Sequence, residues 1–304
     1  MYKLMLVPLD GSELAETVLS YAKELAGRFD LELTLLHVCG PEGVESQFMC
    51  RSYLERTAEI LRQQSREVQA QTSAPLGGKA VEVKVEVATG NPAEEILHYA
   101  EENAVDIILM GSHGRSGVGR WFLGSVVDKV LRKSKIPIWL VRANISERIV
   151  HDEWPNRIML VPLDGSRFAE SVLPHVEALA NQRGAKLMKI ILLRVVEEPF
   201  ISADYPFPDW KEHVNQIREH FKQEAEQYLV KVEKLLHDAR LNVRTELLMG
   251  KPVDEIINYA NNNHPNLIVL ATHGSSAISR WEFGNTADKI LHGVSSPIFL
   301  VRPH

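Results

Sequence analysis

Short apolar runs alternate with longer segments of helical periodicity along the first half of the chain. Lys3–Leu9 and Asp106–Met110 are almost continuously apolar, which is typical of strands buried on both faces of a sheet. Between such runs, apolar residues recur every three or four positions, which predicts helices. The expected strands are Lys3–Leu9, Glu32–Val38, Val81–Ala88, Asp106–Met110 and Pro137–Val141, and the expected helices are about Ser12–Phe29, Ser46–Gln71, Pro92–Asn103 and Gly124–Lys133. This alternation favours a mainly parallel sheet covered by helices on both faces, with ligands at the carboxyl ends of the strands.

The same pattern occurs twice. Leu6–Ser12 and Leu160–Ser166 both read LVPLDGS, which gives seven identities at an offset of 154. A second motif, H-G-x-S followed by R-W, begins at His113 and recurs at His273, at an offset of 160. The six additional residues of the second copy are expected in Pro199–Trp210, where prolines and aromatic residues cluster as in a loop. The chain is therefore an internal repeat.

Length and composition agree with two globular domains. The chain has 304 residues, of which 45% are hydrophobic and 24% charged, as in ordinary globular proteins. The polar stretch Ala143–Asn156 separates the two copies. We expect domains at residues 1–143 and 157–304, each a doubly wound, five-stranded, mainly parallel sheet between helices.

Charge and apolar run lengths exclude several partners. The net charge of −6 gives no overall positive field for nucleic acid or an anionic membrane. The longest apolar runs are far shorter than the ~20 residues of a membrane-spanning helix, and the N-terminal run is too short for a signal peptide. We therefore expect a cytoplasmic protein. Cys39 and Cys50 form neither a C-x-x-C pair nor a disulfide framework, which removes support for a zinc or redox motif.

Glycines surround one predicted strand-to-helix junction. Gly111 and Gly114 are followed, after nine residues, by Gly124 and Ser125 at the start of a helix. Glycine lets backbone N–H groups approach an anion, and a helix N-terminus supplies unpaired donors, so phosphate is the ligand that this junction fits. The intervening residues add Arg115. The alternative is that the glycines only form turns and Ser125 only caps the helix; the repeated spacing weakens it.

Asp10 has two interpretations. With Glu13 it forms the D-x-x-E pattern of a helix capping box. In the second copy Asp164 is followed at the same distance by Arg167, so the aspartate recurs without its capping partner. A contact with a ligand, or with Mg²⁺ that bridges to phosphates, is the other interpretation. His113 has no second ligand at metal-binding spacing, which favours a hydrogen-bonding role.

Motifs of dedicated catalysis are missing from the sequence. It contains neither a G-x-x-x-x-G-K-[ST] loop nor a complete G-x-G-x-x-G fingerprint after a strand, and no G-x-S-x-G elbow. Paired carboxylates do not recur in the two copies. We expect no catalytic residues.

The glycine spacing, together with the strand and turn at Asp10, resembles the ATP-binding signature of the universal stress protein family. The resemblance covers nearly the whole chain and indicates a tandem member. It implies a five-stranded parallel sheet between helices and binding of ATP or AMP, with Mg²⁺ accompanying ATP. It places adenine beside Val38, and Asp10 near the nucleotide and its metal. The site residues that it implies are Pro8, Asp10, Val38, Met110, Gly111, His113, Gly114, Arg115, Gly124, Ser125 and Val126.

The second copy departs from this signature. Ala271 replaces the first glycine and Asn285 replaces the serine. The corresponding, weaker set is Pro162, Asp164, Val195, Gly274, Gly284, Asn285 and Thr286. Loss of one hydrogen bond to a charged phosphate weakens binding by about 1.5–3 kcal/mol, or about tenfold and more. We expect weaker nucleotide binding in the second copy, unless Asn285 and Thr286 restore the contacts.

The resemblance implies a cytoplasmic stress-response protein that binds and senses ATP or AMP, mainly in its first domain. The alternative is a structural or interaction protein that keeps the fold and works through its surfaces without nucleotide. Pro137–Val141 and Pro297–Val301 are short apolar strands at corresponding positions. Because exposed apolar edge strands tend to pair, we expect the two copies to form an intrachain pseudo-dimer through them. Whether two chains then form a homodimer is left open.

Overall fold

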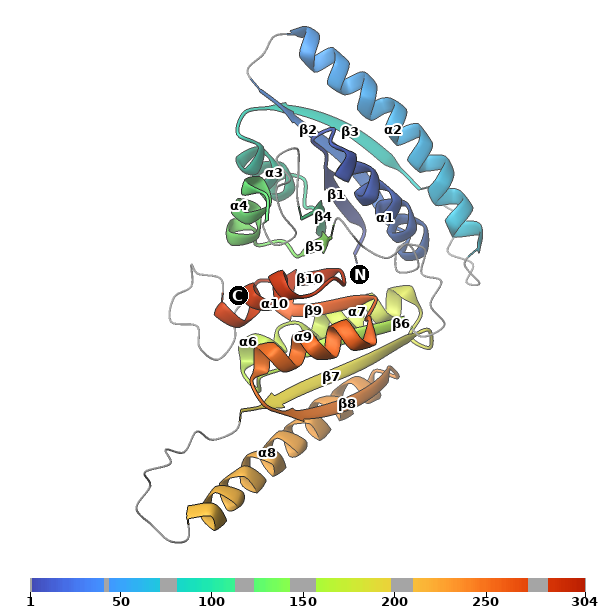
Figure 1. The fold of residues 1–304 in the computed structure, drawn as a ribbon. Helices are drawn as coiled ribbons and strands as arrows, with labels where there is room; N and C mark the ends of the chain where they lie inside the picture. Colours follow the sequence, from blue (N-terminus) through green and yellow to red (C-terminus); the bar gives the residue numbers. More distant parts are fainter. Residues whose placement is uncertain are drawn as a thin grey trace. The chain divides into compact units, whose positions relative to one another are not determined.

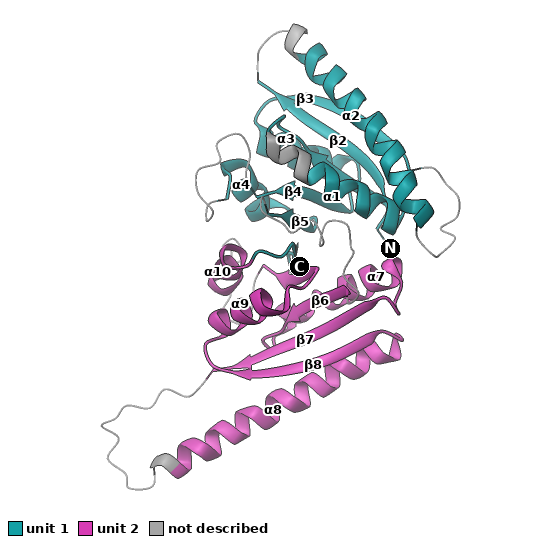
Figure 2. Cartoon of the chain, turned by 45° about the vertical axis from the view of Figure 1, so that its right-hand side comes forward, with its two compact units in different colours: residues 1–155, 295–302, 304 teal, residues 156–294, 303 magenta. Residues whose placement is uncertain are grey.

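The structure is a computed structural model with two compact units. It describes residues 2–40, 44–71, 81–112, 123–142, 157–197, 210–272 and 284–303, with side chains omitted at 13–17, 44–46, 210 and 211. The first unit comprises residues 1–155, 295–302 and 304, and the second comprises 156–294 and 303 (Figure 2). Each unit is described by itself below.

The first unit contains the strands and helices expected from the sequence, in the same order. They are β1 (Leu4–Pro8), α1 (Glu13–Phe29), β2 (Glu32–Cys39), α2 (Val44–Gln71), β3 (Val83–Thr89), α3 (Pro92–Glu102), β4 (Ile107–Gly111), α4 (Ser125–Lys133) and β5 (Ile138–Val141). The bounds differ from expectation by at most two residues, as is usual where helix ends fray.

These five strands form a parallel sheet in the order β3-β2-β1-β4-β5. After β1 the chain proceeds outward to β2 and β3, and then returns to β4 on the other side of β1. Because parallel crossovers are right-handed, this reversal places α1 and α2 on one face of the sheet and α3 and α4 on the other (Figure 1). The doubly wound α/β fold is confirmed. The strand order reverses between β1 and β4, and ligands of such sheets bind at the carboxyl ends of the strands beside the reversal.

One strand from the far end of the sequence belongs to the first unit. β10 (Ile298–Val301) pairs antiparallel with β5, with Ile298 opposite Leu140. Phe299 is fully buried, and its ring centroid lies 5.6 Å from that of Trp139. The pseudo-dimer of the two copies stays a prediction.

The second unit repeats the arrangement of the first. Its elements are β6 (Arg157–Pro162), α6 (Arg167–Glu170), α7 (Leu173–Arg183), β7 (Met188–Val196), α8 (Trp210–Asp238), β8 (Asn242–Met249), α9 (Pro252–Asn263), β9 (Leu267–Ala271) and α10 (Asn285–Gly293). Its strands are parallel, in the order β8-β7-β6-β9. Most of the stretch expected as a loop, Pro199–Trp210, lies outside the described residues.

The first helix of the second copy is broken, in contrast to α1. Pro174, which aligns with Ser20 of α1, stands in the first turn of α7. A proline further inside a helix lacks the N–H for the i−4 bond and clashes with the preceding turn, so a new helix begins beside it. The short α6 before it is capped by the side chain of Ser166, a residue of the LVPLDGS motif.

The long helices bury one stripe each. In α2, Leu54, Ala58 and Leu61 are at most 2% exposed, whereas Phe48 and Met49 are 70% exposed.

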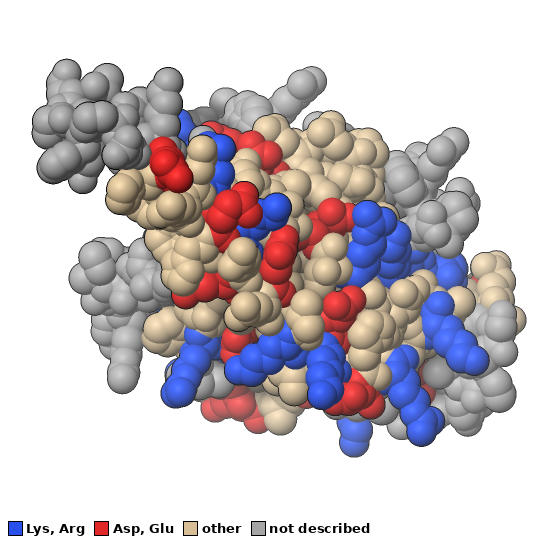
Figure 3. Space-filling view, turned by 90° about the horizontal axis from the view of Figure 1, so that it is seen from below, with Lys and Arg blue, Asp and Glu red and all other residues tan. Residues whose placement is uncertain are grey.

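Among the described residues, no helix is long and apolar enough to cross a membrane. On the face drawn in Figure 3, Lys and Arg are interspersed with Asp and Glu.

Candidate functional site

The turn after β1 is built by an Asp-Gly-Ser sequence. Gly11 has φ +73°, in the left-handed region that glycine adopts without strain. Oδ1 of Asp10 accepts a hydrogen bond from the backbone N–H of Ser12, at 3.0 Å. Ser12, and not Asp10, is the N-cap residue of α1, so the capping-box interpretation of Asp10 with Glu13 is wrong. The aspartate instead stabilises the turn that precedes α1, because its side chain accepts from the backbone N–H two residues later, as aspartates in turns commonly do.

A histidine on β2 holds the same turn. The N–H of Leu9 donates to the carbonyl oxygen of Leu36 at 2.9 Å, which prolongs the pairing of β1 with β2. Nδ1 of His37 lies 2.8 Å from the carbonyl oxygen of Leu9, so that this nitrogen is the donor. Val38, the residue expected beside adenine, therefore lies on the strand next to the Asp10 turn.

The end of β4 is joined directly to the start of α4. Gly111 is opposite Val141 of β5, and Ser112 N donates to Val141 O at 2.8 Å. Gly124 N donates in turn to Ser112 O at 2.9 Å, which closes the loop between β4 and α4. Gly124 is the N-cap of α4, and no side chain caps this helix from that position. Its first turn therefore presents backbone N–H donors at the carboxyl edge of the sheet.

The second copy closes its loop in the same way. Gly284 N donates to Thr272 O at 2.9 Å, and Gly284 is the N-cap of α10. The loops themselves, with the expected site residues His113, Gly114, Arg115 and Gly274, lie outside the described residues.

The described candidate residues gather at one edge of each unit. In the first unit these are Pro8 at the end of β1, Asp10 after it, Val38 on β2, Met110 and Gly111 on β4, and Gly124, Ser125 and Val126 at α4. In the second unit they are Pro162, Asp164, Val195, Gly284, Asn285 and Thr286. Because β1 lies beside both β2 and β4, the candidate residues of the first unit belong to three neighbouring strand ends and one helix start.

The two copies differ at the serine of the turn. Oγ of Ser12 is buried and has no hydrogen-bond partner within the described part of the chain. Oγ of Ser166 accepts from Ala169 N at 3.1 Å and donates to Oδ1 of Asp164 at 2.6 Å. A buried hydroxyl without a partner is costly, so the Ser12 hydroxyl of the first copy is suited to a hydrogen bond with a ligand. The Ser166 hydroxyl of the second copy already has hydrogen-bond partners within the protein.

An arginine in the second copy takes the position of His37. Arg194 aligns with His37 in the motif L-L-[HR]-V, and its Nη1 donates to the carbonyl oxygen of Leu163 at 3.3 Å. A Cβ added to Gly165 would lie 3.6 Å from the guanidinium. A larger, permanently charged side chain thus covers the turn at Asp164.

Further groups surround this arginine. Its Cζ lies 5.9 Å from the centroid of the Tyr228 ring. Burial raises the pKa of Tyr228, as does the nearby Glu170 carboxylate, while Arg194 opposes the rise. The edge of the second unit therefore holds its own network of charged and polar side chains.

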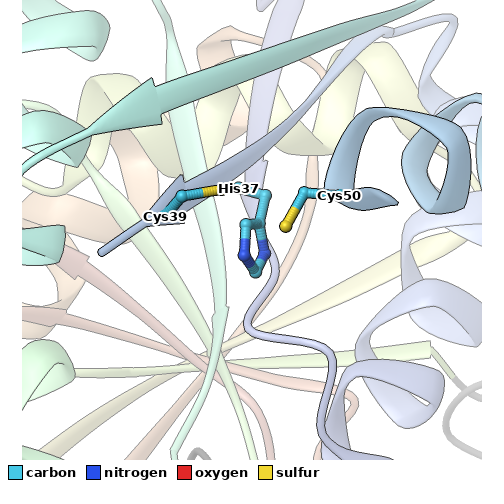
Figure 4. Close-up of side chains that lie close together, drawn as sticks. All are labelled: His37, Cys39 and Cys50. Atoms are coloured by element: carbon cyan, nitrogen blue, oxygen red, sulfur yellow. The ribbon is translucent and has the colours of Figure 1, made fainter. Parts of the chain in front are cut away.

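One cluster of possible metal ligands in the first unit was not predicted from the sequence. His37 and Cys39 on β2 lie beside Cys50 on α2, and one ligand atom from each is within 4.8 Å of the others (Figure 4). Only the pair His37 and Cys39, two residues apart on a strand, is visible in the sequence. Cys50 is brought in by the packing of α2 on β2, which no spacing rule reports.

Comparisons with known proteins agree with the repeat. The sequence model of the universal stress protein family matches residues 1–142 and 155–302. The universal stress protein YxiE of Bacillus subtilis is 32% identical over 149 residues, which cover 47% of this chain and 100% of that protein. A universal stress protein of Mycolicibacterium smegmatis is 23% identical over 305 residues, which cover 98% of this chain and 97% of that protein.

Among solved structures, a universal stress protein from Archaeoglobus fulgidus has a similar fold. The TM-score is 0.63 at 18% sequence identity, and the match covers 98% of both chains. This similarity extends over both copies of the repeat.

Proposed function

Because the chain belongs to the universal stress protein family, we propose that its first unit binds an adenine nucleotide, ATP with Mg²⁺ or AMP, at the carboxyl ends of β1 and β4. The observation that carries this proposal is the reversal of the strand order between β1 and β4, where β4 ends at Gly111 and α4 begins after Gly124. Ligands of open α/β sheets bind at such positions.

Each part of the site has a role in this proposal. The N-terminus of α4, which its N-cap residue Gly124 leaves without a side-chain cap, would bind the phosphates together with Gly114 and Arg115. The buried Ser12 hydroxyl would gain a partner, and the Asp10 carboxylate would hold Mg²⁺. Val38 borders the adenine. No group of the site is assigned to catalysis, so hydrolysis is expected to be slow at most.

We propose further that the second unit binds nucleotide at least about tenfold more weakly. Three differences support this. Ala271 and Asn285 replace the glycine and serine of the signature. The Ser166 hydroxyl already accepts a hydrogen bond from Ala169 N, and Arg194 covers the turn by donating to the Leu163 carbonyl oxygen.

Titration calorimetry of the full chain with ATP and Mg²⁺, and with AMP, tests both proposals. We expect about one tight site per chain. Gly114→Val abolishes it, because a branched side chain blocks the approach of the phosphates. Gly274→Val, the matched change in the second copy, leaves it intact.

Absence of heat, together with absence of nucleotide in the mass spectrum of the purified protein, favours the alternative of an interaction protein. Two equal sites contradict the asymmetry alone. The cytoplasmic location, the stress-sensing role and the pseudo-dimer stay predictions.

A further inference from the structure

Two thiols and an imidazole lie together in the first unit, outside the contacts assigned to nucleotide. One ligand atom each from His37, Cys39 and Cys50 lies within 4.8 Å of the other two. They come from two elements, β2 and α2, and the three side chains face one another (Figure 4). Cys39 is 3% exposed, and Cys50 is half-buried.

One nitrogen of the imidazole is held by the fold, which leaves the other available to a metal. Its Nδ1 donates to the carbonyl oxygen of Leu9 at 2.8 Å, which leaves a lone pair on Nε2. Metal-binding histidines regularly donate their other N–H to a backbone carbonyl, which fixes the tautomer and the ring orientation. For His37, the accepting carbonyl belongs to Leu9 in the turn after β1, whereas the three proposed ligands lie on β2 and α2.

We propose that His37, Cys39 and Cys50 bind a thiophilic cation, for which Zn²⁺ is the best match. Zn²⁺ takes thiolate sulfur at about 2.3 Å and imidazole nitrogen at about 2.0 Å in a tetrahedral arrangement, so that its ligand atoms lie about 3.5–3.8 Å apart. The three atoms, which lie within 4.8 Å of one another, therefore need to approach by at most about 1.3 Å. Binding releases the two thiol protons to solvent, forms two Zn–S bonds and one Zn–N bond, and leaves the fourth position to water.

A disulfide between the two cysteines explains the cluster less well. A disulfide gives His37 no role, whereas a metal site uses all three side chains.

The chain contains only two cysteines, which makes the test specific. The reduced, nucleotide-free full chain is titrated with Co²⁺, whose thiolate charge-transfer absorption can arise only from Cys39 and Cys50. We expect a band that saturates at one Co²⁺ per chain and that one equivalent of Zn²⁺ removes. Cys50→Ser and Cys39→Ser each lower the affinity by about 100-fold or more, since even outer contacts to a metal site are worth 10–100-fold.

His37→Gln distinguishes a three-ligand site from two thiols alone. The glutamine amide can still donate to the Leu9 carbonyl, but it offers the metal no imidazole. We expect weaker Zn²⁺ binding. His98→Gln, on exposed α3 of the same unit, serves as the matched control and leaves binding unchanged. Thermal unfolding of each metal-free variant checks that the unit remains folded.

Three outcomes overturn the proposal: no charge-transfer band in the wild-type chain, a band that persists in Cys50→Ser, or air oxidation to a Cys39–Cys50 disulfide in a chain that binds no Zn²⁺. Because the titrations contain no nucleotide, they are independent of the proposal for the nucleotide site.

Discussion

At the scale of single residues, identical sequence gives two different hydrogen-bond patterns. LVPLDGS occurs in both copies, and Asp10 and Asp164 each accept the N–H of the serine two residues later. Only in the second copy does the serine hydroxyl cap a helix, through Ala169 N. The motif predicted the turn, but the difference depends on the helix after it and could not be read from the motif.

The serine pair gives a prediction at this scale. Ser166→Ala removes an N-cap bond and should destabilise the second unit by about 1 kcal/mol. Ser12→Ala removes a hydroxyl without a partner among the described residues, so stability should hardly change while nucleotide affinity falls. Denaturant unfolding and calorimetry of both variants measure this. Equal losses of stability would mean that Ser12 makes a capping bond after all.

At the scale of elements, apolar periodicity predicted the order and nearly the bounds of the helices and strands in the first unit. It missed the interruption after α6, because Val172 and Val176 continue the apolar spacing across Pro174 and are both buried. It also missed the cluster of His37, Cys39 and Cys50. Periodicity states which face of α2 is buried, but it does not state which residue of β2 lies opposite Cys50.

The packing of α1 on α2 gives a prediction for a pair of elements. A Cβ at Gly27 would lie 2.7 Å from the backbone oxygen of Ser65 and 2.8 Å from Val68. Gly27→Ala should therefore force the two helices apart and destabilise the first unit by about 1–3 kcal/mol, which exceeds the helix propensity that alanine adds.

Gly40→Ala is the control for this change, because no atom of the described residues lies within 4 Å of a Cβ at that position. Urea unfolding of both variants compares them. A Gly27→Ala variant as stable as the parent chain would show that α1 and α2 move apart at little cost.

At the scale of the whole molecule, the repeat in the sequence predicted two doubly wound copies. It did not predict that β10 would group with the first unit, because chain order assigns Ile298–Val301 to the second copy. Both β5 and β10 are short apolar strands, which predicted that the two copies associate through them but not to which compact unit β10 belongs.

The role of β10 in the first unit can be tested through Phe299. Its ring is buried against Trp139, so Phe299→Ala should cost about 3–5 kcal/mol and accelerate amide hydrogen exchange in β5. Phe221→Ala on α8, where the ring is 42% exposed, should leave β5 unchanged. Unaltered exchange in β5 of the Phe299→Ala variant would contradict the assignment of β10 to this unit.

The position of β10 also sets an order of events during synthesis. About 160 residues are translated between β5 and β10, which takes about 10–30 s at ribosomal rates of 5–20 residues per second. Throughout that interval the nascent chain carries an apolar strand edge, Ile138–Val141, that has no antiparallel partner, and such edges pair readily with other chains. The time that the ribosome takes, and not the stability of the finished fold, determines how long this protein is most exposed to aggregation.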